Sequence, residues 1–146
     1  MMILPQVSLV LAAALALINC WLSFRVGQVR GSEKVSIGDG GNDRVIRRMR
    51  AHANFVENAW AVLALVLVIE LSVGTSIWLW AAAALFVAGR IGHAFGMDGW
   101  YPGRTGGTGI TLGLQLILAI WAVVIPLKAH RAATAAPVAE TTVPQG

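Results

Sequence analysis

Long apolar stretches alternate with short polar segments along this chain of 146 residues. The apolar stretches cover residues 4–24, 59–71, 75–95 and 108–127, and the helix of the second is expected to begin earlier, near Asp43. Asn42 or Asp43 suits its N-cap, because a short polar side chain accepts from free backbone N–H groups. A helix needs about 20 mostly apolar residues to cross a bilayer. Because these runs do not alternate as membrane strands do, the pattern predicts an all-α bundle of four transmembrane helices.

The composition agrees with a membrane protein. Hydrophobic residues make up 57% of the chain and charged residues 12%, whereas soluble domains carry about 25% charged residues. We expect a single transmembrane domain over residues 1–131, and a disordered tail over residues 132–146, which is rich in Ala, Thr, Pro and Val. The lone Cys20 excludes an internal disulfide. No Lys or Arg precedes the first apolar run as in a signal peptide, so this run is expected to remain in the mature protein.

The basic residues gather between the first two apolar stretches. Seven of the 11 Lys and Arg residues fall within residues 25–50, namely Arg25, Arg30, Lys34, Arg44, Arg47, Arg48 and Arg50. Beside apolar spans such a cluster indicates a cytosolic loop, and no nucleic-acid partner is expected. With four spans, both termini would lie outside, and the first and third connecting segments would lie in the cytosol.

Polar side chains also occur within the second helix, where an intramembrane charge costs roughly 2.5–3.5 kcal/mol. Steps of four and three residues place Asn54 and Glu57 about 40° and 20° from Arg50 on an ideal helix. Arg47 lies at the edge of the same face. These side chains therefore form one polar stripe.

The third and fourth stretches add further polar groups at the cytosolic end. Arg90 and His93 are neighbours on one face of the third helix. Arg104 follows in the segment of residues 96–104, which we expect to be a loop leading into the fourth helix. Glu70 and His52 lie off the polar stripe and are expected at the membrane interface.

Two interpretations of these polar groups remain open. In the first, Arg50 with Glu57, or Arg90 with Glu57, forms a buried ion pair that only holds helices together. In the second, the arginines bind carboxylates and the glutamate holds an ammonium group, which suits a small zwitterion with more carboxylates than amines. Apolar helix faces alongside would receive a lipophilic co-substrate from the bilayer. The residues by themselves do not name the ligand.

Several segments resemble one known family. They comprise residues 25–30, 35–42 and 47–58, with Arg50-x-His52-x-Asn54-x-x-Glu57 at the core, and later residues 89–96 and Arg104-x-x-Gly107-x-x-x-Thr111. This series resembles the MAPEG family, the membrane-associated proteins in eicosanoid and glutathione metabolism, and its bacterial branch in particular. The resemblance covers about residues 5–127, and it implies an integral protein of the bacterial inner membrane.

The resemblance also implies a homotrimer that holds glutathione between neighbouring subunits near the cytosolic side, and no metal. Together with Arg50 of the polar stripe, the residues expected to bind glutathione are Arg30, Asn54, Glu57, Arg90 and His93. Arg104 matches the family arginine that stabilises the glutathione thiolate and is the expected catalytic residue; the competing assignment for this role is Arg90 of the third helix. A free thiol has a pKa of about 8.5, so a nearby cation raises the thiolate fraction. We also expect the backbone at residues 106–108 to contribute, as the N-terminus of the fourth helix.

The expected function is that of a membrane-bound glutathione-dependent transferase or peroxidase acting on lipophilic electrophiles. The alternative is a non-catalytic MAPEG-like scaffold that binds lipid. Three residues depart from the family pattern: Ala53 replaces an arginine of the prostaglandin-synthase branch, Met97 replaces a tyrosine, and Trp60 replaces a proline. Ala53 and Met97 favour the scaffold, whereas Arg104 with Glu57 favours the enzyme. A small transporter would show repeats or broken helices, and the sequence shows neither.

Overall fold

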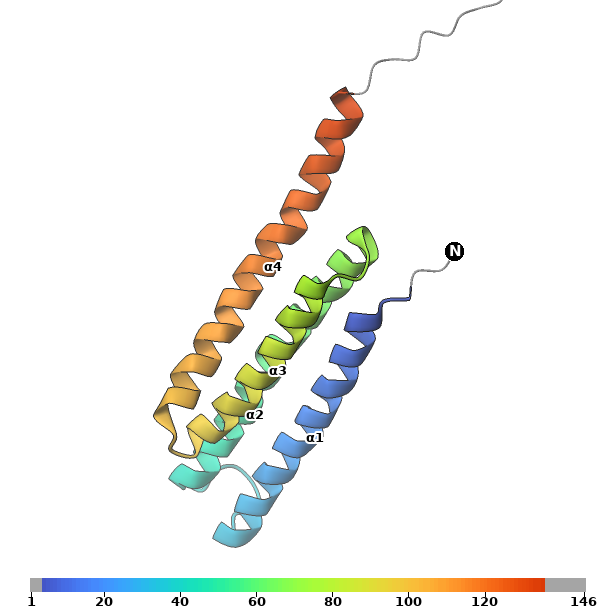
Figure 1. Ribbon diagram of the computed structural model, residues 1–146. Coiled ribbons are helices and arrows are strands. Elements are labelled where there is room, and N and C mark those ends of the chain that lie inside the picture. Colours follow the sequence, from blue (N-terminus) through green and yellow to red (C-terminus); the bar gives the residue numbers. More distant parts are fainter. Residues whose placement is uncertain (1–3, 136–146) are drawn as a thin grey trace, which may run out of the picture.

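The computed structural model describes residues 4–135, which form a bundle of four helices. The helices are α1 (Gln6–Glu33), α2 (Asp43–Val73), α3 (Ile77–Met97) and α4 (Tyr101–Ala135). The α1–α2 and α3–α4 connections lie at one end of the bundle and the α2–α3 turn at the other (Figure 1). Each helix is long and apolar enough to cross a membrane. The predicted all-α architecture with four transmembrane helices is confirmed.

Two of the helices, α1 and α4, extend further than the apolar stretches predicted. α1 continues past Phe24 to Glu33, so Arg25 and Arg30 lie on a helix and not in a loop. α4 begins at Tyr101 and continues through Pro126 to Ala135, so residues 132–135 of the predicted tail are helical. The remainder of that tail, residues 136–146, lies outside the described residues. Hydropathy identifies only the part of a helix that lies in the hydrocarbon core. Backbone hydrogen bonding can continue the same helix into the polar interface of the membrane.

The connection between α1 and α2 follows the polar and glycine pattern of the sequence. Asn42 is the N-cap of α2, as predicted: its side-chain oxygen accepts from the backbone N–H groups of Arg44 at 3.0 Å and Val45 at 3.3 Å. Gly40 and Gly41 have positive φ angles of 60° and 68°. A side chain is strained in this region, so glycine allows the chain to turn sharply into α2.

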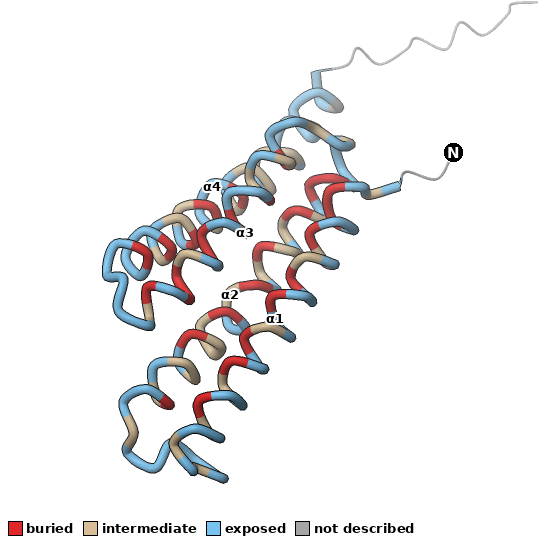
Figure 2. Tube along the Cα trace, turned by 60° about the horizontal axis from the view of Figure 1, so that its bottom comes forward, coloured by how far each residue is buried: buried red, intermediate tan, exposed pale blue. Residues whose placement is uncertain are grey.

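The inward faces of the helices form one apolar core (Figure 2). On α1 the buried side chains recur every three or four residues, as Val7, Leu11, Leu15, Ile18 and Leu22. They belong to the same cluster as Phe55, Val62 and Val66 of α2 and Phe86 of α3. Large apolar side chains also cover the outer surface, for example Leu17, Trp60, Leu116 and Ile117. Such an exterior suits lipid or another protein chain, not water.

α3 and α4 pack backbone against backbone through glycines. A Cβ atom added to Gly107 would lie 2.5 Å from the carbonyl oxygen of Gly89 and 2.7 Å from the Cβ of His93. The backbone of Gly96 meets the backbone of Arg104 equally closely. Small residues allow membrane helices to approach in this way. The glycines thus bring His93 and Arg104 to neighbouring positions.

Glu70, which we expected at the membrane interface, lies near the end of α2 and is wholly buried within the bundle. Its carboxylate accepts from the backbone N–H groups of Val7 at 2.9 Å and Ser8 at 2.8 Å, and from the hydroxyls of Ser8 at 2.6 Å and Thr75 at 2.7 Å. Pro5, at the N-cap of α1, makes no side-chain capping bond. Glu70 therefore caps the N-terminus of α1 from a neighbouring helix, where the helix dipole favours a negative charge.

Candidate functional site

Polar side chains from three helices meet in one hollow of about 320 Å³. It lies toward the end of the bundle that carries the α1–α2 and α3–α4 connections. Its lining residues are Arg50, Ala53, Asn54 and Glu57 of α2, His93 and Met97 of α3, and Arg104 and Thr108 of α4. The predicted stripe on α2 is thus brought together with His93 and Arg104.

Arg90 lies buried beside this hollow, with 1% of its surface exposed. Its guanidinium donates to the hydroxyl of Thr111 at 3.0 Å and to the side-chain oxygen of Asn54 at 2.8 Å. The Nη2 atom of Arg90, which donates to Asn54, also lies 3.3 Å from Nδ1 of His93. Asn54 and His93 both line the hollow, so Arg90 holds two of its walls in place.

The charged groups of the hollow are not paired with one another. Arg50, Glu57 and Arg104 are exposed in the single chain. Within residues 4–135 the ion pairs join Arg25 and Arg48 to Asp98, and Arg44 to Glu33. The ion pairs considered from the sequence, Arg50 with Glu57 and Arg90 with Glu57, are therefore absent from this part of the chain. Neither of these two ion pairs with Glu57 therefore holds the helices of one subunit together.

Arg30 is not among the residues that line the hollow. Its guanidinium donates to the backbone carbonyl of Ser36 at 3.5 Å and to the sulfur of Met49 at 3.4 Å. The structure therefore does not bring Arg30 together with the other predicted site residues of the same chain.

Arg104 lies on the first turns of α4, and not in a loop as expected. The third connecting segment is correspondingly short, because α3 ends at Met97 and α4 begins at Tyr101. The expected contribution of the backbone at residues 106–108 is wrong for the same reason. Only the first four N–H groups of a helix are free, and these glycine and threonine amides lie further along it.

Three polar residues escaped the sequence reasoning. Thr108 lines the hollow one turn after Arg104, and its four-residue spacing from Arg104 was the available signal. Asn58 and Gln115 form an amide pair between α2 and α4, with the Gln115 amide donating to the Asn58 side-chain oxygen at 3.1 Å. A single polar residue in an apolar run, such as Gln115, carries no periodic signal. Its partner became evident only from the packing of the helices.

The fold and the hollow define a class of protein: a small integral membrane protein of four helices, three of which line a charged hollow near one end. A family model for the MAPEG family matches residues 8–124, and the chain belongs to this family. The family as a whole is associated with glutathione. No curated protein and no solved structure is a significant match. The family resemblance of the sequence is thereby confirmed.

Proposed function

We propose that this protein is a membrane-bound glutathione-dependent transferase or peroxidase that acts on lipophilic electrophiles. The observation that carries the proposal is the hollow of about 320 Å³, which gathers Arg50, Glu57 and Arg104 from two helices. Its volume falls within the roughly 300–1,000 Å³ typical of small-molecule sites. Family membership supplies the independent support.

The charges around the hollow complement those of glutathione. The tripeptide carries two carboxylates, one ammonium group and a thiol. Arg50 and Arg104 supply two guanidinium groups on the wall, and Glu57 supplies one carboxylate. Arginine binds a carboxylate through two parallel hydrogen bonds, and a carboxylate is the natural partner of an ammonium group. Arg90, buried beside the hollow, adds a further positive charge nearby.

Arg104 is the proposed catalytic residue. It lies on α4 and lines the same hollow as the polar stripe of α2, and its guanidinium would stabilise the sulfur of bound glutathione as a thiolate. With an aryl halide, the thiolate attacks the ring carbon, a C–S bond forms, and the halide leaves with the bonding electrons. The thiol proton passes to solvent. With a hydroperoxide, attack on oxygen breaks the O–O bond and gives an alcohol and a sulfenic acid, which a second glutathione converts to disulfide and water.

We further propose that the site is shared between the copies of a homotrimer. Glu57 is exposed on α2, two residues before the apolar run that begins at Ala59. A charge facing lipid at this depth is costly, so a neighbouring subunit is its more favourable environment. Arg30, which lies outside the hollow of its own chain, would then be available to the site of a neighbour.

The alternative, a non-catalytic lipid-binding scaffold, is favoured by one observation. Ala53 and Met97, two of the three departures from the family pattern, both line the hollow. Compared with the family pattern, each replaces a polar side chain of the wall by an apolar one. A scaffold of this kind would retain the bundle and lose glutathione binding.

Calorimetric titration of glutathione into the purified protein separates the two functions. The matched variant is Glu57→Gln, which keeps the shape and a hydrogen-bonding group but removes the charge expected to hold the ammonium. We expect this variant to bind glutathione about 10- to 100-fold more weakly, with the oligomer intact. If the unmodified protein shows no binding, the proposed glutathione-dependent function is wrong. A variant that dissociates in detergent without a separable binding defect would show that Glu57 only holds subunits together.

A further inference from the structure

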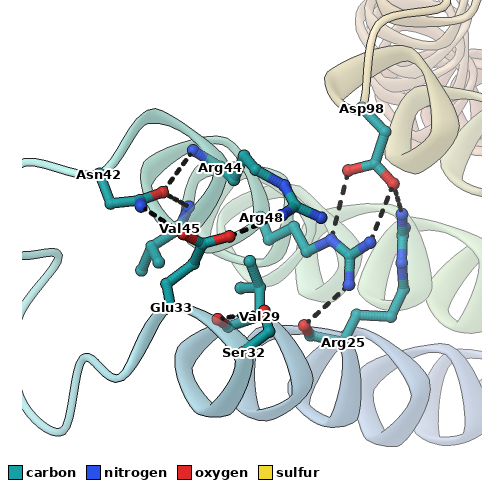
Figure 3. A network of polar contacts seen from close by, with 9 residues as sticks. All are labelled: Arg25, Val29, Ser32, Glu33, Asn42, Arg44, Val45, Arg48 and Asp98. Carbon is teal, nitrogen blue, oxygen red and sulfur yellow. Dashed lines mark hydrogen bonds and ion pairs between the residues drawn. The ribbon is translucent and has the colours of Figure 1, made fainter.

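A second polar network lies at the same end of the bundle, outside the hollow (Figure 3). At its centre is Asp98, the residue that follows the last residue of α3. Arg25 of α1 donates to the Asp98 carboxylate, and Arg48 of α2 lies 3.4 and 3.5 Å from its two oxygens. Arg48 also donates to the backbone carbonyl of Arg25 at 3.1 Å. One carboxylate thus connects the α3–α4 turn to both α1 and α2.

Arg25 is fixed on several sides at once. Only 8% of its surface is exposed. Its guanidinium lies 4.8 Å from the ring centre of Trp21 and 5.4 Å from that of Phe95, distances at which a cation is attracted to an aromatic face. Phe95 belongs to the last turn of α3. The guanidinium therefore holds α3 both through Phe95 and through Asp98.

The position of Asp98 is not explained by the stability of α3 itself. A helix dipole places negative charge at the C-terminus, so an aspartate there is unfavourable, and the last turn of α3 has no basic residue to offset it. The compensating cations come from α1 and α2. Asp98 therefore serves the arrangement of the helices relative to one another.

The turn held by Asp98 leads directly to the proposed catalytic residue. Only Gly99 and Trp100 separate Asp98 from the start of α4, and Arg104 lies on the first turns of that helix. Gly96 packs closely against the backbone of Arg104. Met97, between Gly96 and Asp98, lines the hollow. A shift of this turn would therefore move both Arg104 and one wall of the hollow.

We propose that Asp98, held by Arg25 and Arg48, is a positioning residue that anchors the α3–α4 turn and thereby fixes Arg104 over the hollow. The assignment rests on the proposed function, because it gives Arg104 its catalytic role. Neither Asp98 nor its two arginines would contact glutathione.

The test compares Asp98→Asn with Glu33→Gln in the full-length protein. Asp98→Asn keeps the side-chain shape and removes the charge. Glu33→Gln removes the ion pair with Arg44, at the same end of the bundle and 2.6 Å long, which does not involve the α3–α4 turn. Three quantities are measured for each: amide hydrogen exchange of residues 105–108, whose N–H groups close the first turns of α4, affinity for glutathione, and the rate of conjugation of an aryl halide at saturating glutathione.

For Asp98→Asn we expect exchange at residues 105–108 to rise and the conjugation rate to fall by about tenfold or more, with glutathione affinity within about threefold of the unmodified protein. Asp98→Glu, which restores the charge, should recover most of the rate. Glu33→Gln should leave all three quantities unchanged.

The proposal is overturned if exchange in Asp98→Asn matches that in Glu33→Gln, or if exchange rises while the rate stays the same. An unmodified protein without glutathione binding or conjugation would overturn the proposed function and, with it, the positioning role. The exchange measurement would then still decide separately whether Asp98 anchors the turn.

Discussion

Gly107 offers a sharp test of how α3 and α4 build the site. It lies on α4 between Arg104 and Thr111, in backbone contact with α3. In Gly107→Ala the new Cβ would stand 2.5 Å from the Gly89 carbonyl oxygen, whereas an ordinary contact begins at 3.4 Å, so the helices must separate by about 0.9 Å. Because the neighbouring atoms are backbone and the Cβ of His93, no flexible side chain can give way.

The separation of the helices should affect stability and the catalytic rate to different extents. Overpacking costs about 1–3 kcal/mol, but alanine in place of glycine returns up to about 1 kcal/mol of helix propensity. The melting temperature in detergent should therefore fall only modestly. His93 and Arg104 would move apart, and a displacement of about 1 Å can reduce a rate by about 100-fold. We expect a loss of about 10- to 100-fold in aryl halide conjugation.

Gly106→Ala is the matched control, because a Cβ at Gly106 meets nothing within 4 Å. It makes the same chemical change one residue away and should retain full activity, with equal or slightly higher stability. Equal conjugation rates for the two alanine variants would refute the reasoning that close packing at Gly107 sets the geometry of the site.

Two further predictions concern the membrane and the buried carboxylate. In membrane vesicles of defined orientation, Lys34 should be labelled only from the cytosolic side and tags at the termini only from the other side, because basic loops stay in the cytosol; a cytosolic C-terminus would reverse the orientation. Glu70→Gln should lower the melting temperature in detergent, since an amide NH₂ group would face donors of Val7, Ser8 or Thr75 and cost about 1–3 kcal/mol. An unchanged melting temperature would show that the capping of α1 contributes nothing to stability.

The architecture follows from the sequence because apolar length is a direct physical signal. The four spans and the Asn42 cap depend on local properties: hydropathy over about 20 residues, and a polar side chain at the start of a helix. The helix ends were less accessible, as at Arg25 and Arg104, because helices continue into the interface where hydropathy is no guide.

The polar side chains likewise divide into those predictable from spacing on one helix and those whose roles depend on packing between helices. The stripe of Arg50, Asn54 and Glu57 is a matter of spacing on one helix, and the structure places all three on one hollow. The partners of Glu70 and Asp98 lie on other helices, so their roles depend on packing that no local pattern reports. The capping of α1 by Glu70 was not predicted for this reason.

The most direct test of the central claim is the ultraviolet absorbance of bound glutathione thiolate. We predict that the unmodified protein develops this band when glutathione is added at neutral pH, since a cation beside the sulfur raises the thiolate fraction above that of a free thiol with a pKa of about 8.5. Arg104→Ala should abolish the band and reduce conjugation far more than it weakens binding. In Arg90→Ala, by contrast, the loss should fall mainly on binding, because Arg90 supports Asn54 and His93. An intact band and rate in Arg104→Ala would contradict the assignment of this arginine, and the absence of the band from the unmodified protein with any thiol would contradict the account as a whole.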